Sequence, residues 1–389
     1  MLRIGIEDAS IATGHYFLPL SELAEHNSID VQKYYVGLGQ EQFSWVAEDE
    51  DIVTMAANAA KPILAAEVKS ELGSVLFATE TGIDQSKSAG VYLQSLLDLP
   101  RNIRVIEVKQ ACYAAAAAVQ LACAMVAREP NKKVLVIGSD IAKYEMGSTG
   151  EPTQGAAAVA LLVSASPKMI EFDASTGVFT NDTMDFWRPN YSTTAHVDGK
   201  TSISAYLDAV KGVWQDYQAK GGAPYSDFAR FCYHQPFTKM AAKAHRTLAL
   251  ENGIRLTSPE VEEQILSTTV YNRRLGNSYT ASLFSALLSL LENDSQDLTG
   301  QRIGLLSFGS GSVAEFFSGV ICSGYQEHLR GSQHQQMLAN RVELTYEKYA
   351  ELHERTLPTD GSRTENPTVT TGAFRFAGLA DHKRLYEAR

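Results

Sequence analysis

Short β-rich runs alternate with longer helical segments along most of the chain, and this alternation constrains the fold more than any single motif. In the N-terminal half the β-rich runs are residues 75–78, 105–108, 134–137 and 157–163, with alanine- and leucine-rich segments between them. The C-terminal half has β-rich runs at 228–233, 303–308 and 313–321, and helical patterns near 239–250, 259–271 and 279–292. This alternation predicts an α/β fold.

Two pairs of segments indicate that the halves are related. The small-residue helix that begins at Ala111-Cys-Tyr-Ala-Ala-Ala has a counterpart at Gly276-Asn-Ser-Tyr-Thr-Ala-Ser. Likewise, Gly155-Ala-Ala-Ala-Val-Ala-Leu-Leu-Val is similar in pattern to Gly311-Ser-Val-Ala-Glu-Phe-Phe-Ser-Gly-Val. We therefore predict one half over residues 1–167 and a second over 168–329.

Two regions depart from the alternation. Residues 168–226 are poor in periodicity and are predicted to form a loop-rich insertion in the second half, where long loops often line binding sites. Residues 330–389 are more polar and are expected to form a peripheral C-terminal extension.

Composition excludes several classes of protein. With 389 residues, 44% of them hydrophobic, the chain is long enough to bury two cores of ordinary domain size. A net charge of -11 argues against a nucleic-acid partner. Four cysteines without paired spacing predict a reducing cytoplasmic location and no structural metal. No N-terminal leader or uninterrupted apolar run of about 18 residues occurs, so we expect no membrane partner.

Cys112 is the strongest candidate for a nucleophile. It lies where a β-rich run turns into an alanine-rich helix, and helix-terminal N–H groups predict a thiol pKa below the ordinary value of about 8.5. The alternative is a structural thiol, since free cysteine often packs as a small hydrophobic side chain. Cys123, Cys232 and Cys322 lie in apolar stretches and fit that alternative better.

Other polar side chains follow β-rich runs in the same way. Glu80 ends one run, at the edge of the sheet where open α/β folds bind ligands, although helix capping would also explain a glutamate there. His234 ends another run just before Pro236, which stops further strand pairing; a hydrogen-bonded structural histidine is the alternative. Asn277 lies at a helix start, where capping alone would explain it.

The glycine-rich turn Ser307-Phe-Gly-Ser-Gly-Ser follows a third run and could bring backbone N–H groups near a substrate oxygen. It lacks the lysine and spacing of a phosphate-binding loop, so we expect no nucleotide cofactor. A thiol, a carboxylate, an imidazole and backbone donors together indicate acyl transfer with carbon–carbon bond formation.

The motifs around these residues resemble those of the bacterial hydroxymethylglutaryl-CoA synthases over most of residues 1–345. The matching segments are Ala-Thr-Glu-Thr at Glu80, Lys-Gln-Ala-Cys-Tyr at Cys112, Gly150-Glu-Pro-Thr-Gln-Gly-Ala, Asp185-Phe-Trp-Arg-Pro, His234-Gln-Pro-Phe-Thr-Lys-Met, Gly276-Asn-Ser-Tyr-Thr-Ala-Ser and Ser307-Phe-Gly-Ser-Gly-Ser-Val-Ala-Glu-Phe-Phe. The resemblance implies a thiolase-like five-layered αβαβα architecture built from two similar halves, and usually a homodimer.

The resemblance also implies an acyltransferase that condenses acetyl-CoA with acetoacetyl-CoA and water to give 3-hydroxy-3-methylglutaryl-CoA and CoA in the mevalonate (isoprenoid) pathway. Cys112 would carry the acetyl group, Glu80 would be the general acid/base at its methyl, and His234 would orient and polarise acetoacetyl-CoA. Coenzyme A thioesters would be substrates, and no cofactor is expected.

The remaining site residues are also implied by their places in the matching motifs. Those expected to line the acyl site are Tyr144, Thr153, Phe186, Ser202, Asn277 and Ser307. Lys239 and Lys243 would hold the CoA portion, although Ala241-Ala242 stands where the family usually has Gly-Lys. The last forty or so residues do not follow the family pattern.

Three alternatives remain open from the sequence. One is the related synthase for polyketide β-branching, whose acyl groups ride on acyl carrier proteins and which would keep the same catalytic residues. A second is a ketoacyl-carrier-protein synthase that uses Cys112, His234 and Asn277, although decarboxylative condensation needs no carboxylate base such as Glu80. The third is a non-catalytic thiolase-fold binding or assembly protein.

Overall fold

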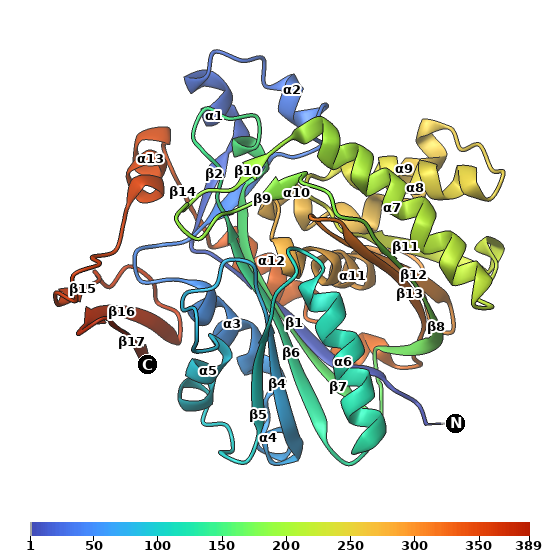
Figure 1. The fold of residues 1–389 in the computed structure, drawn as a ribbon, viewed down its shortest axis with the longest axis horizontal. Coiled ribbons are helices and arrows are strands. Elements are labelled where there is room, and N and C mark those ends of the chain that lie inside the picture. Colours follow the sequence, from blue (N-terminus) through green and yellow to red (C-terminus); the bar gives the residue numbers. More distant parts are fainter. Residues whose placement is uncertain (1) are drawn as a thin grey trace.

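The computed structural model describes residues 2–389, and its largest element is a nine-stranded mixed sheet (Figure 1). The order of the strands across this sheet is β11 (Phe228–Tyr233), β12 (Arg302–Gly309), β13 (Val313–Ile321), β8 (Ile170–Thr180), β1 (Gly5–Thr13), β7 (Gly155–Ser164), β6 (Lys133–Ala142), β4 (Leu72–Ala78) and β5 (Arg104–Val108). Every β-rich run predicted from the sequence lies in one of these strands, so the α/β prediction is confirmed.

The sheet consists of two half-sheets with the same topology. Only two residue pairs, Gly5 with Glu171 and Ile6 with Ile170, join β1 to β8. Outward from this junction, β1, β7 and β6 pair antiparallel in one half-sheet, and β8, β13 and β12 pair antiparallel in the other. The next strand is parallel in both: β4 pairs with β6, and β11 pairs with β12. Within residues 2–389, β5 has no counterpart in the second half-sheet. The shared topology supports the relation inferred from the sequence.

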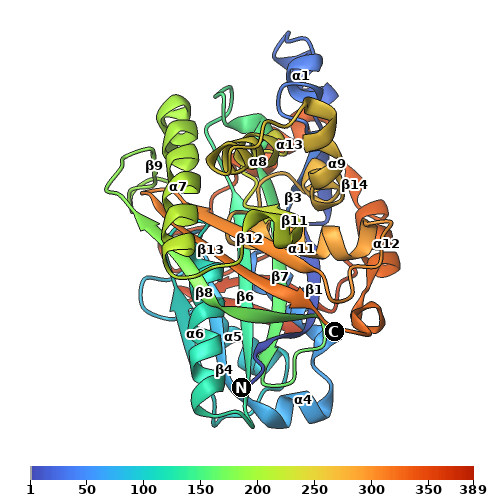
Figure 2. The same ribbon diagram turned by 90° about the vertical axis from the view of Figure 1, so that its right-hand side faces the viewer.

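Successive side chains of a strand point to opposite faces of the sheet, and helices pack on both faces of each half-sheet, so the molecule has five layers. In β6, Val134 faces the central helices α6 (Ala114–Arg128) and α11 (Ser282–Asn293), while Leu135 faces the outer helix α3 (Ile52–Ala60). In β12, Leu305 faces the same central core and Leu306 faces α7 (Gly199–Ala219) and α8 (Lys239–Glu251). Figure 2 shows β12 and β13 in front of β6 and β7 and oblique to them. Strands β6, β7 and β12 bury nearly all their residues on both faces because helices cover both.

The stretch 111–128, which includes α6, is long and apolar enough to cross a membrane by length and composition alone. In the structure, α6 packs on β4, β6 and β7 in the central layer. Its small side chains, Ala114 to Ala118, allow this close packing in the core.

The prediction of a loop-rich segment over residues 168–226 is wrong for most of its length. The segment contains the eleven-residue β8 and the twenty-one-residue α7, and only 181–198, with the short strands β9 (Phe186–Trp187) and β10 (His196–Val197), is irregular. α7 begins at Asp198, whose side chain accepts the Lys200 and Thr201 N–H groups. Its buried stripe mixes aromatic and small residues at helical spacing, namely Tyr206, Ala209, Val210, Val213, Trp214 and Tyr217.

The C-terminal region, expected to be a peripheral extension, packs onto the outer helices of the first half. Its hairpin, β16 (Phe374–Ala380) and β17 (Lys383–Ala388), contacts α3 and α5 (Gly90–Leu96). The Asp51 carboxylate accepts the Tyr386 hydroxyl at 2.6 Å, and the buried Asp49 accepts the Thr370 N–H. A buried acidic turn in the first half therefore supplies the acceptors that hold this tail.

The remaining helices and strands surround these layers. They are β2 (Tyr16–Pro19), α1 (Leu20–His26), α2 (Gln32–Tyr35), β3 (Gln42–Trp45), α4 (Ala66–Glu71), α9 (Ser258–Thr269), α10 (Asn272–Leu275), α12 (Gly331–Ala339), β14 (Val342–Glu343), α13 (Tyr346–Glu354) and β15 (Thr364–Glu365). Among them, β14 pairs with β2, and this pairing also joins the C-terminal region to the first half.

Gly276 makes a turn that another residue could not make without strain. Its φ of 76° and ψ of -163° lie in a region used almost only by glycine, and an added Cβ would lie 1.8 Å from the Gln154 carbonyl oxygen. We expect Gly276→Ala to lower the free energy of unfolding in urea by about 3 kcal/mol, since strain and a backbone clash add. Gly300→Ala is the matched control, because Gly300 also has a positive φ (74°) but open space around it. The Gly300→Ala variant should lose about 1 kcal/mol of unfolding free energy. Equal losses in the two variants would contradict a clash at position 276.

Candidate active site

A cavity of about 350 Å³ has both Cys112 and His234 in its lining. Several other residues singled out in the sequence line the same cavity, namely Tyr144, Thr153, Phe186, Ser202, Lys243 and Asn277. They come from both halves of the chain, so the site depends on the contact between the half-sheets. Their individual roles stay predictions.

Two residues expected in this site lie elsewhere. The Lys239 ammonium donates to the Val36 carbonyl at 2.8 Å and lines a separate depression with Arg246 and Arg273. Ser307 is buried in β12 without lining the cavity, whereas Phe308 and Ser310 of the same segment do line it. Successive strand residues point to opposite faces, so the side chains of Ser307 and Phe308 diverge.

A strained turn presents Cys112 two residues before α6. The preceding residue, Ala111, has a φ of 42°, which is unusual for a residue other than glycine. The glycine-rich turn predicted from the sequence lies against it: the Gln110 amide donates to the Ser310 carbonyl at 3.1 Å, and a Cβ at Gly309 would lie 2.6 Å from the Gln110 carbonyl oxygen. Glycine at 309 therefore permits the close approach of these two turns.

Cys112 and Glu80 form a buried pair. The Cys112 thiol donates to Glu80 Oε1 over 3.0 Å. Burial raises the pKa of Glu80 to about 8, with a further increase from the charge of Asp140. Burial, and then the Glu80 charge, also raise the pKa of Cys112. The prediction of a thiol pKa lowered by the helix end is therefore wrong for this resting site, where burial favours the protonated form of both the thiol and the carboxyl group.

Asp140 holds the Glu80 loop in place. Its Oδ1 accepts the Glu80 N–H at 2.9 Å and both the N–H and hydroxyl of Thr81, and it also accepts the Thr79 hydroxyl. Its Oδ2 accepts the N–H and hydroxyl of Thr280 from the second half. The sequence analysis missed Asp140, although it follows the β-rich run 134–137 just as Glu80 follows 75–78.

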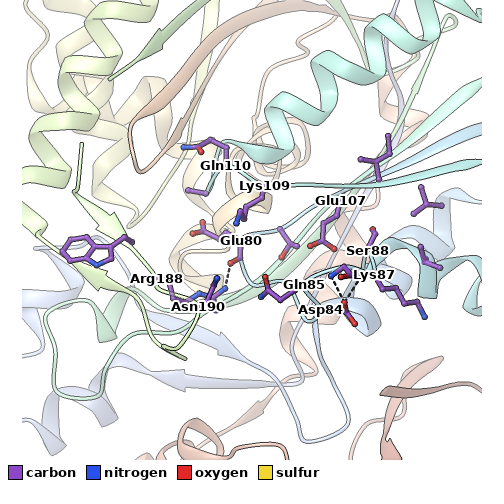
Figure 3. A pocket seen from close by; sticks show the side chains of 18 of the residues that line it. Glu80, Asp84, Gln85, Lys87, Ser88, Glu107, Lys109, Gln110, Arg188 and Asn190 are labelled. Atoms are coloured by element: carbon purple, nitrogen blue, oxygen red, sulfur yellow. Dashed lines mark hydrogen bonds between the residues drawn. The ribbon is translucent and has the colours of Figure 1, made fainter. Parts of the chain in front are cut away.

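Glu80 is not among the residues that line the cavity of Cys112 and His234; it lines a second, larger cavity of about 890 Å³ (Figure 3). There the Arg188 guanidinium donates to the Glu80 main-chain carbonyl at 2.5 Å, as the dashed line in Figure 3 shows. Arg188 belongs to the irregular segment 181–198, and Phe186 of the same segment lines both cavities. The carboxyl loop is thus held by Asp140 and by this segment.

His234 is a neutral imidazole at the end of β11. Burial lowers its pKa to about 3. Its main-chain N–H donates to the Leu306 carbonyl at 2.9 Å, and its carbonyl accepts the Tyr206 hydroxyl at 2.7 Å. With Nδ1 unpartnered in the structure and the ring in the cavity lining, it can offer one N–H to a substrate oxygen.

Asn277 and three aromatic rings complete the surroundings of Cys112. The Asn277 Oδ1 accepts the Tyr279 N–H at 2.9 Å, so its NH₂ group is the part left for a ligand. The rings of Tyr144, Phe186 and Tyr279 lie 5.8–6.4 Å apart, edge to face, and cluster with Cys112. Lys200, Tyr206 and Tyr279 line the cavity but were missed by the sequence analysis; Lys200 belongs to a segment that it treated as loop.

The described residues, 2–389, contain no group of three or more histidine, cysteine, aspartate or glutamate side chains placed to hold a metal ion.

Comparison with known proteins identifies the family. The hydroxymethylglutaryl-coenzyme A synthase N-terminal model matches residues 2–168, and the C-terminal model matches 170–254 and 246–366. The chain belongs to the hydroxymethylglutaryl-CoA synthase family. It is thus a transferase-family protein, and the predicted thiolase-type fold is confirmed, because the solved structures of this family that it matches have that fold.

Relatives and a solved structure extend the match over nearly the whole chain. The hydroxymethylglutaryl-CoA synthase of Enterococcus faecalis is 41% identical over 367 residues, which cover 93% of this chain and 94% of that protein. The polyketide biosynthesis 3-hydroxy-3-methylglutaryl-ACP synthase PksG of Bacillus subtilis is 34% identical over 371 residues, covering 90% and 87%. A crystal structure of HMG-CoA synthase complexed with CoA has a TM-score of 0.94, 38% identity and complete coverage of both chains.

The raised pKa of Glu80 predicts how the rate of a base-catalysed step depends on pH. A carboxyl with a pKa of about 8 is protonated below that pH. The fraction in the carboxylate form therefore falls about tenfold for each pH unit below the pKa and approaches one above it. We expect the rate of condensation of preformed acetyl-enzyme, measured by rapid quenching at pH values between about 6 and 9, to rise with pH in this way. The Glu80→Ala variant should lack this rise. A rise centred near the ordinary glutamate pKa of 4.5 in the wild-type protein would contradict the role of Glu80 as the base with a raised pKa.

Proposed function

We propose that the protein condenses acetyl-CoA with acetoacetyl-CoA and water, giving 3-hydroxy-3-methylglutaryl-CoA and CoA through an acetyl-Cys112 intermediate. The observation that carries the proposal is the Cys112–Glu80 contact of 3.0 Å, made by a thiol that lines the same cavity as the neutral imidazole of His234. Glu80 places a base beside the thiol, which supports this reaction over decarboxylative ketoacyl synthesis.

The first step transfers acetyl to the enzyme. This step starts from the form in which Glu80 is ionised: Cys112 passes its proton to the Glu80 carboxylate along the existing hydrogen bond, and the sulfur attacks the thioester carbonyl. The carbonyl carbon–sulfur bond to CoA then breaks, and the leaving CoA sulfur takes a proton. Glu80 is thereby returned to its carboxylate form for the next step.

The second step forms the carbon–carbon bond. The Glu80 carboxylate removes a proton from the acetyl methyl, and the carbon attacks the β-keto carbonyl of acetoacetyl-CoA. The His234 imidazole donates a hydrogen bond to that carbonyl oxygen as charge develops on it, and the Glu80 carboxylic acid then protonates the alkoxide. Water finally cleaves the Cys112 thioester, releasing a carboxylate and restoring the thiol.

The cavity mouth is suited to an anionic thioester. Lys243 and Lys200 line the cavity, and both carry ammonium groups that could meet CoA phosphates. Lys239 could still contribute from the neighbouring depression. None of these steps needs a cofactor or a metal, and we propose a cytoplasmic enzyme of the mevalonate pathway with no nucleic-acid or membrane partner.

We also propose a homodimer formed through β5. This strand is an edge of the sheet with free hydrogen-bonding groups on one side, and its Ile106 is 45% exposed. Pairing with β5 of a second copy would extend the sheet and cover Ile106. Sedimentation at micromolar concentration would measure the mass of the particle.

A carrier-protein substrate is the second candidate, and it is supported by the likeness to PksG. Intact mass spectrometry after mixing with acetyl-CoA or with acetyl-carrier protein separates the two candidates. We expect stoichiometric acetylation within seconds from acetyl-CoA and little from the carrier. The reverse preference would favour the β-branching reaction.

Cys112→Ser should abolish this acetylation, because a hydroxyl is a far weaker nucleophile than a thiol at neutral pH. Cys123→Ser is the matched control, since Cys123 is a half-buried thiol on α6 outside the cavity. It should acetylate normally. Acetyl-enzyme formed at the normal rate by Cys112→Ser would remove Cys112 from the mechanism.

His234→Ala should spare acetylation and slow condensation by about 10²–10³-fold, since the N–H donor acts only when the acceptor carbonyl gains charge. The two steps are measured separately, by acetylation without acetoacetyl-CoA and by turnover with varied acetoacetyl-CoA. A variant defective in acetylation alone would show that His234 serves Cys112 instead.

A further inference from the structure

The main chain of Tyr144, a residue in the cavity lining, is held by side chains at both of its polar groups. Its N–H donates to the Gln154 Oε1 at 2.8 Å, and its carbonyl accepts from His353 Nε2 at 2.7 Å. His353 lies on α13, more than two hundred residues further along the chain. The C-terminal region therefore reaches the backbone of an active-site residue.

A second residue of α13 holds the other partner of Tyr144. The Gln154 amide donates to the Tyr349 hydroxyl at 2.6 Å, and Tyr349 in turn donates to Glu151 Oε1 at 3.0 Å. Thr153, which lines the cavity, lies between Glu151 and Gln154 on this turn. Through one hydroxyl, Tyr349 thus fixes both ends of a segment that forms part of the cavity wall.

These contacts are enclosed. Tyr349, Gln154 and Glu151 have no exposed surface, and His353 is 4% exposed. The His353 ring stacks on Trp45 with a centroid separation of 5.5 Å, and Tyr349 meets the same ring edge-on. Buried hydrogen bonds of this kind are stronger than exposed ones, and losing one partner leaves an unsatisfied polar group.

The direction of the His353 contact is also fixed. A carbonyl oxygen can only accept, so His353 Nε2 must carry the proton. Burial, and then the neighbouring Lys143 charge, lower the pKa of His353 to about 4, so the ring is a neutral donor at neutral pH. Lys143 Nζ donates to the His353 carbonyl, which ties α13 to the end of β6 a second time.

We propose that α13 is a positioning element of the active site, in which His353 and Tyr349 fix the main chain at Tyr144 and so hold the tyrosine ring against Cys112. This inference rests on the proposed function. The Tyr144 ring clusters with Cys112, Phe186 and Tyr279, so a shift of its backbone would move the wall against which the acetyl group is bound. Displacements of about 1 Å at such a wall can cost up to about 10² in rate.

The test compares His353→Leu with His353→Gln by the single-turnover rate of Cys112 acetylation from acetyl-CoA. Leucine removes the donor, whereas glutamine keeps an N–H at similar reach. We expect about a tenfold slower rate constant for His353→Leu and a rate within about threefold of wild type for His353→Gln. The amplitude of acetyl-enzyme counts the active molecules, so unfolded protein does not enter the rate constant.

Leu352→Ala is the matched control for loss of stability. Leu352 neighbours His353 on α13, packs in the cluster of Tyr349 and Trp45, and lies outside the cavity lining. Its truncation should lower the melting temperature and leave the acetylation rate constant unchanged. Tyr349→Phe, which keeps the ring and loses the hydroxyl, should instead slow acetylation with little loss of aromatic packing.

A double-mutant cycle tests the route of the effect. If α13 acts through Tyr144, His353→Leu should have almost no further effect on acetylation in a Tyr144→Ala background. Full additivity, or a normal rate in both His353→Leu and Tyr349→Phe, would overturn the inference. Absence of acetylation in the wild-type protein would instead overturn the proposed function.

Discussion

The buried carboxylate of Asp140 is the contact on which the geometry of the site depends most. It has no exposed surface, and it accepts hydrogen bonds from the Glu80 loop on one oxygen and from Thr280 on the other. These donors belong to different halves of the chain, so one side chain fixes the carboxyl loop relative to the turn that precedes α11. A buried charge of this kind is tolerated because every donor aimed at it is satisfied.

The same burial decides the state of the Cys112–Glu80 pair. A helix N-terminus favours an anion by about 0.3–1 kcal/mol at exposed positions and up to about 2 kcal/mol when partly buried. Full burial of a carboxyl or thiol can raise its pKa by several units, at about 1.4 kcal/mol for each unit. Desolvation therefore outweighs the helix end. Both groups therefore favour their protonated forms, and the resting site does not present a free thiolate.

Sequence patterns predicted the elements that depend on local periodicity. The β-rich runs, the central helices and the strand-end positions of Cys112, Glu80 and His234 all follow from the alternation of apolar residues. Lys239 and Ser307 show the limit of motif position: Lys239 lies one helical turn from Lys243 but lines a different depression, and Ser307 precedes Phe308 in β12 but points away from the cavity. Asp140, His353 and Tyr349 act through contacts distant in sequence, and no local pattern marks such partners. The α7 helix was missed because tyrosines and tryptophan carry part of its apolar stripe.

The unequal ends of the large sheet limit how copies of the chain can associate. At one end β5 is free, whereas at the other end α9 packs against β11, with Val261 and Ile265 buried in the same cluster as Phe231 and Tyr233. A sheet with two open ends could add copies indefinitely and grow into a fibre. In the dimer proposed above, β5 would pair with itself, so this contact would use the free side of β5 in both copies and growth through it would stop at two. A strand that occurs in one half alone would therefore give the chain a contact that saturates when one partner has bound.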